Sequence, residues 1–203
     1  MIEKLYNTVL KTGFAAAIGV ASLAMTTNGA LSADWTLSGD DSRVAFGSIK
    51  KDKIGEVHHF SSLSGSVKAD GTISLEIDLT SVETFIDIRN ARFLEHIFAA
   101  NAPQAILSGK INMSELESLK AGETTEVDLE GKLTFNAAEV PVEATLFVAR
   151  LAENKVMVTT DEMIMLSTAD LGIDAGVDIL QKLAKLPSIT RVTPVTARMI
   201  FTK

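Results

Sequence analysis

The chain has 203 residues and a mass of 21.7 kDa, and its composition of 46% hydrophobic and 22% charged residues excludes a mainly disordered protein. A formal net charge of −7 without a concentrated basic patch argues against a nucleic-acid partner. The absence of cysteine excludes disulfides, thiolate metal sites and cysteine nucleophiles, and three histidines leave few candidates for metal or acid–base chemistry.

Residues 1–33 have the pattern of a secretory signal peptide. A short basic segment precedes the uncharged apolar segment 12–25, and small residues follow it. That apolar segment is shorter than the roughly 20 residues that a membrane-spanning helix needs. We therefore expect cleavage after Ser32 or Ala33, which leaves one soluble domain over residues 34–203 without a stable membrane anchor. Its location would be the periplasm if the source is a Gram-negative bacterium. The alternative is an uncleaved N-terminal anchor.

Most of residues 34–203 alternate between apolar and polar side chains with a period of two, which is typical of strands that bury one face. Ile73, Leu75, Ile77 and Leu79 are one such series. Turn residues separate the series, and short connections favour antiparallel neighbours. The expected strands cover residues 43–49, 57–68, 73–79, 104–113, 127–135, 140–148, 155–166 and 195–201. A mainly β fold with about eight antiparallel strands predicts a closed barrel or a sandwich.

Two segments have helical spacing instead. Residues 87–99 and 174–186 each carry an apolar stripe, so we expect two short amphipathic helices. Asp87 is a candidate cap for the first helix, and Asp178 with Lys182 forms a favourable pair in the second. The helices would either cover an apolar opening or plug the ends of the barrel as part of its core.

The chain offers no constellation that is typical of catalysis. His58 and His59 are adjacent on a predicted strand and therefore face opposite sides, while His96 has no histidine one helical turn away. We interpret them as ordinary surface or partly buried side chains. No nucleophile-elbow, phosphate-loop, dinucleotide or zinc-protease motif is present. We predict no catalytic residue, no metal site, no cofactor and no enzymatic activity.

Residues 81–90 place Arg89 at a strand-to-helix junction, beside the densest aromatic cluster of the chain. One interpretation is an amphiphile site with an apolar tail inside the fold and a polar head group near Arg89. The other is that Arg89 pairs with Asp87 or caps neighbouring carbonyl groups.

The order of several short motifs resembles the YceI-like family of exported, lipocalin-like proteins. They begin with Trp35 and the segment Ser42–Phe46, continue through Val57–Gly65 and the junction Ser81–Asn90, and extend to Pro141-Val142. The resemblance implies an eight-stranded antiparallel, lipocalin-like barrel that holds a long-chain amphiphile such as a polyisoprenoid, an isoprenoid quinone or a fatty-acid derivative. It also implies a periplasmic location, and it suggests that homodimers are common.

The predicted function is therefore an exported lipid-binding protein that transports or stores one amphiphile. Arg89 is the head-group candidate, and aromatic, aliphatic and methionine side chains are the candidate liners because they present apolar surface. These liners are Phe46, Phe60, Leu79, Phe85, Phe93, Leu94, Phe98, Leu107, Leu133, Phe135 and Met199. The alternative is a filled barrel without a lipid ligand, which binds a protein partner or a second copy of itself.

Overall fold

We describe a computed structural model of the chain, which covers residues 34–98 and 104–203. The predicted signal peptide lies outside these residues. The strands are β1 (Trp35–Leu37), β2 (Arg43–Lys50), β3 (Ile54–Phe60), β4 (Leu63–Val67), β5 (Thr72–Asp78), β6 (Val82–Glu83), β7 (Gln104–Lys110), β8 (Thr124–Phe135), β9 (Ala138–Ala152), β10 (Lys155–Thr160), β11 (Ile164–Ser167) and β12 (Val192–Thr202). The helices are α1 (Asp87–His96), α2 (Ser114–Ser118), α3 (Asp174–Leu183) and the 3₁₀ turn η1 (Leu79–Ser81).

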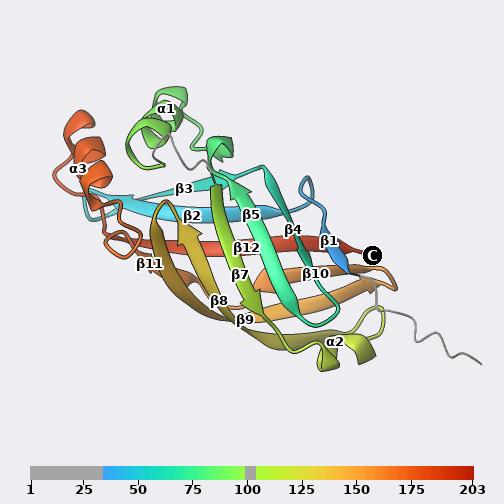
Figure 1. Cartoon of the computed structure of the whole chain (residues 1–203). Coiled ribbons are helices and arrows are strands. Elements are labelled where there is room, and N and C mark those ends of the chain that lie inside the picture. The colour runs from blue at the N-terminus through green and yellow to red at the C-terminus, as the bar shows by residue number, and fades with distance from the viewer. Residues whose placement is uncertain (1–33, 99–103) are drawn as a thin grey trace, which may run out of the picture. The chain divides into compact units, whose positions relative to one another are not determined.

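The predicted antiparallel barrel is confirmed. Eight strands form a closed ring in the order β1-β4-β5-β7-β8-β9-β10-β12, and β12 closes the ring by pairing with β1. Thr36 lies opposite Thr202 in that closing pair. The remaining strands β2, β3, β6 and β11 extend the sheet at one end, with β2 and β11 pairing with β12. Figure 1 shows this end beside α1 and α3, away from the C-terminus.

Period-two alternation explains the core. On β8 the side chains of Val127, Leu129 and Phe135 are buried, whereas Asp128 and Glu130 between them are exposed. The other strands of the ring direct their apolar residues to the same interior, so the two faces of the sheet become the inside and the outside of one barrel.

Two of the predicted strands are interrupted. The predicted strand 57–68 is divided into β3 and β4, because the hydroxyl of Ser81 accepts the N–H groups of both Ser61 and Ser62, at 3.2 and 3.0 Å. These two groups therefore leave the strand ladder. The predicted strand 155–166 is likewise divided into β10 and β11.

The two predicted helices form, with corrected ends and contacts. They end at His96 and Leu183 rather than at residues 99 and 186. The expected cap is wrong, since Ile86 occupies the N-cap position of α1 and no side chain caps that helix. The expected pair within α3 is also wrong, because Asp178 instead accepts a hydrogen bond from Arg191 at 2.5 Å.

Helices α1 and α3 pack against each other over one end of the barrel (Figure 1). Gly176 on α3 lies directly against the carbonyl oxygen of His96, where any Cβ atom would collide with the backbone. A glycine is therefore required for this close approach. Both helices present apolar side chains to the barrel interior, including Phe93 on α1 and Val177 on α3.

Candidate binding cavity

Among the described residues, cavities of about 240 Å³ and about 110 Å³ lie in the barrel interior. They are lined by successive inward residues of the same strands. On β5, Ile77 lines the larger cavity and Leu75 the smaller one, and on β12, Val195 and Ala197 are divided in the same way. Since these residues are two positions apart on one face, the cavities lie end to end inside the barrel.

The wall of the larger cavity is dominated by aromatic rings. The ring of Phe60 lies 5.2 Å from that of Phe46 and 5.6 Å from that of Phe98, measured between ring centroids. Phe98 in turn contacts Phe93 and Phe135. Helix α3 covers the cavity with apolar side chains, so the lining is apolar except at one side.

Most of the predicted liners do line a cavity. The larger cavity is bordered by Phe46, Phe60, Leu79, Phe93, Phe98, Leu133 and Phe135, together with Arg89. The smaller cavity is bordered by Leu107 and Met199. Two expectations are wrong. Leu94 packs against the core without lining either cavity, and the side chain of Phe85 is 74% exposed and lies outside both.

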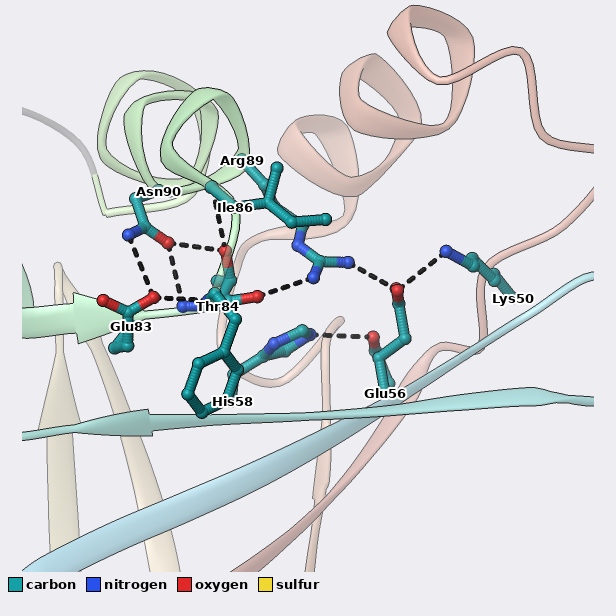
Figure 2. Close-up of polar contacts among 10 residues, drawn as sticks. Lys50, Glu56, His58, Glu83, Thr84, Ile86, Arg89 and Asn90 are labelled. Carbon is teal, nitrogen blue, oxygen red and sulfur yellow. Dashed lines mark hydrogen bonds and ion pairs between the residues drawn. The ribbon is translucent and has the colours of Figure 1, made fainter.

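The polar side of the larger cavity is an ion cluster of Arg89, Glu56 and Lys50 (Figure 2). Oε1 of Glu56 lies 2.6 Å from Nη1 of Arg89 and 2.7 Å from Nζ of Lys50. Burial by itself would raise the pKa of Glu56, but the hydrogen bonds from Lys50 and Arg89 outweigh it and hold the pKa below its ordinary value. Two cations on one carboxylate leave the cluster with one excess positive charge.

Arg89 is positioned by the loop that precedes α1. Its Nη2 donates to the carbonyl oxygen of Thr84 at 2.7 Å, and Thr84 is itself buried. The amide oxygen of Asn90 accepts the backbone N–H of Thr84 at 2.8 Å and its hydroxyl at 2.5 Å. Of the alternative roles predicted for Arg89, the pair with Asp87 is wrong, since its carboxylate partner is Glu56, whereas the hydrogen bond to a neighbouring carbonyl group is confirmed at Thr84. Nε of Arg89 is buried and has no partner among the described residues.

His58 extends this polar side into the cavity. Only 1% of the residue is exposed, so the expectation of a surface or partly buried histidine is wrong for it. Its Nε2 lies 3.3 Å from the hydroxyl of Ser48, and its Nδ1 is buried without a partner among the described residues. Burial, reinforced by the positive charge of Arg89, lowers the pKa of His58 to about 4. The ring is therefore neutral near pH 7, and its Nδ1 is left with an unused hydrogen-bonding capacity.

Sequence reasoning missed Ser48, Lys50, Glu56 and His58 as cavity residues. A signal for all four was present. Glu56, His58 and Phe60 follow each other at every second position on β3, and Phe46, Ser48 and Lys50 do so on β2. The predicted strand began one residue too late to include Glu56.

Residues 35–195 match the family model of the YceI-like domain. The chain belongs to the YceI-like family. Among solved structures it is similar to a polyisoprenoid-binding domain from Saccharophagus degradans implicated in plant cell wall breakdown, with 30% identity and a TM-score of 0.80. That match covers 83% of this chain and 97% of the other.

BcnA from Burkholderia cenocepacia is similar in fold, with 17% identity, a TM-score of 0.63, and coverage of 81% of this chain and 98% of BcnA. The comparison with curated proteins found no match. Within residues 34–98 and 104–203, no group of three or more histidine and acidic side chains could hold a metal ion. In the same residues no helix is long and apolar enough to cross a membrane.

Proposed function

We propose that this YceI-like protein binds one long-chain amphiphile, with the apolar chain in the barrel and the polar head at the Arg89 cluster. The observation that carries this proposal is the larger cavity itself. Its wall is apolar and aromatic, and its polar side carries the side chains of Arg89, Lys50, Glu56 and His58. The charged guanidinium of Arg89 at the edge of an apolar cavity is a suitable partner for a polar head group.

The energetics favour a long chain. Each buried methylene group contributes about 0.8 kcal/mol, while association costs about 4–15 kcal/mol. A chain of fewer than about ten carbons would therefore barely bind. A longer chain can extend from the larger cavity toward the smaller one, because the two lie end to end. The polyisoprenoid-binding relative supports a polyisoprenoid or another long-chain lipid as the ligand class.

The head group should carry hydrogen-bond acceptors. The excess positive charge of the cluster suits a carbonyl, carboxylate or phosphate oxygen. A neutral His58 can donate or accept at Nδ1, according to its tautomer. Covalent chemistry is not part of the proposal.

We further propose that residues 1–33 direct export and that the domain transports or stores its ligand in the periplasm. The basic, apolar and small-residue order of this segment supports that assignment. The measurement is the N-terminus of the protein recovered from its host. Cleavage after Ser32 or Ala33 supports an exported protein with a removed signal peptide, whereas an intact Met1 contradicts cleavage and favours the uncleaved anchor.

The decisive experiment is native purification followed by solvent extraction and lipid mass spectrometry. We expect a long-chain lipid in stoichiometric amount, and uptake of a fluorescent long-chain fatty acid or prenol by delipidated protein. Empty protein that takes up neither probe would contradict lipid binding and favour the filled-barrel alternative. A variant with Arg89→Gln should retain the chain but discriminate less among head groups.

A further inference from the structure

Exposed apolar side chains gather beside the polar side of the cavity. Val57 on β3 and Phe85, Ile86 and Ile88 at the start of α1 are 68%, 74%, 47% and 59% exposed. We call these four residues the apolar rim. Val57 and His59 share the outward face of β3, and the ring of Phe85 lies 5.6 Å from that of His59. The rim is therefore one surface that joins β3 to α1.

The backbone at Phe85 has a conformation that is unusual for a residue with a bulky side chain. Phe85 has a φ of +62°, in the left-handed region that disfavours residues with a bulky side chain. The carboxylate of Glu83 accepts its N–H, and the buried Thr84 before it donates its own N–H to the amide oxygen of Asn90. A disfavoured conformation that directs an aromatic ring into solvent gains nothing from the core, and such sites are typically functional.

The rim lies at the place where the cavity reaches the surface. Arg89, the residue after Ile88, lines the cavity and pairs with Glu56. Lys50, Glu56 and Arg89 are each more than one-fifth exposed, so solvent reaches the cavity between β3 and α1. A ligand that enters here passes directly beside the rim.

The charge of the domain is distributed unevenly about this point. Residues 49–57, 83–98 and 164–191 surround the helix-covered end and carry eight basic and eight acidic residues, whereas the rest of 34–203 carries nine basic and seventeen acidic ones. The net charges are 0 and −8. Several basic side chains of this end have no acidic partner among the described residues, namely Lys51, Lys53, Arg92, Lys182 and Lys185.

We propose that the apolar rim docks on the surface of an anionic lipid bilayer. Apolar side chains at the boundary and unpaired lysines around them are the two components of interfacial binding, and the acidic remainder of the domain would be repelled from the same surface. The charge asymmetry thus orients the cavity opening toward the membrane. That the docked protein exchanges its ligand there rests on the proposed function, whereas docking itself does not.

The test is vesicle sedimentation with residues 34–203, which contain a closed barrel and are a compact unit apart from the N-terminal segment. The probes are vesicles of phosphatidylcholine alone and of phosphatidylcholine with one-third phosphatidylglycerol. We expect binding to the anionic vesicles that weakens in high salt, and about a tenfold loss for the double variant F85S/I88S. The matched control I106S/L151S removes two exposed apolar side chains on β7 and β9, which pair with neither β3 nor β6, and should bind normally.

A second pair of variants tests the charge asymmetry. K51E/K53E should lose binding to the anionic vesicles, whereas K68E/K120E, with the same change in net charge outside this end, should retain it. Equal losses in both pairs, or no preference for anionic vesicles, would overturn the proposal. So would a rim variant that changes only the oligomeric mass, because the face would then bind a second copy. For each variant, uptake of a fluorescent fatty acid without vesicles shows whether ligand binding is intact. A loss of vesicle binding with normal uptake therefore reports on docking alone.

Discussion

Arg89 on α1 and Glu56 on β3 form an ion pair of 2.6 Å that joins the helix to the edge of the barrel sheet. Beyond His59 and Phe60, which pair with β6, strand β3 has β2 as its only strand neighbour among the described residues. The ion pair therefore links β3 to α1 at the point where the strand ladder ends. The same contact forms the polar side of the larger cavity.

Removal of one partner of this pair should destabilise the protein. For Glu56→Ala we expect a loss of about 1–2 kcal/mol in the free energy of unfolding, because Arg89 and Lys50 lose their acceptor while each stays partly solvated. Urea denaturation measures it. The double variant E56A/R89A should recover part of the loss. As a control, Glu139→Ala in the exposed Lys132–Glu139 pair should cost less than about 0.5 kcal/mol.

Filling the larger cavity should block ligand binding without unfolding the barrel. Val195 on β12 lines that cavity, and Val195→Trp would place an indole ring in space that a ligand chain would occupy. We expect uptake of a fluorescent long-chain fatty acid to fall about tenfold. Thr196→Trp, one residue along and facing outward, is the matched control and should bind normally. Equal uptake by both variants would place the ligand elsewhere.

Acidification below about pH 6.5 should destabilise the protein because of His58. The folded protein keeps His58 neutral down to about pH 4, whereas the unfolded chain takes up a proton near the ordinary value of 6.5. Between these values the unfolded state binds more protons, so the stabilisation is complete above about pH 6.5 and is lost as the pH falls toward 4. The difference between the two pKa values corresponds to about 3 kcal/mol in the free energy of unfolding. Urea denaturation at several pH values above 5 measures the slope.

Two histidine variants test whether His58 causes the pH dependence of the free energy of unfolding. His58→Gln should flatten it, while His59→Gln should leave most of it, since His59 lies on the outward face. Burial and Arg43 also lower the pKa of His59, so a small part of the slope belongs to it. Glu56 adds to the acid sensitivity only near and below its ordinary value of 4.5. A slope that survives His58→Gln would contradict the assignment.

The contact between the two helices depends on Gly176. A methyl group at this position would collide with the backbone carbonyl oxygen of His96. The backbone of α3 fixes the position of the methyl group, so neither partner can turn aside. We expect Gly176→Ala to cost about 1–3 kcal/mol in the free energy of unfolding, through separation of α3 from α1. Gly55→Ala is the control, because no atom lies within 4 Å of the position that its methyl group would take, and its cost should be small. Thermal unfolding compares the two.

The barrel follows from the sequence because alternation is a local property. Each series such as Ile73 to Leu79 shows which side chains must leave water, and eight series joined by short connections leave closure as the favoured solution. The apolar stripes of α1 and α3 are equally local. This is why the fold and most of the cavity wall were predictable.

Only the tertiary structure decided which polar residues meet and where single side chains point. Glu56 and Arg89 are 33 positions apart, and no period in the sequence relates a residue on β3 to one on α1. Burial beside these distant groups lowers the pKa of His58, which an isolated strand would leave in water. Phe85 is apolar and directly follows the buried Thr84, yet its backbone is left-handed and its ring is exposed. Hydrophobicity determines how much surface is buried, whereas the direction of one side chain depends on its backbone angles and on the distant groups that hold them.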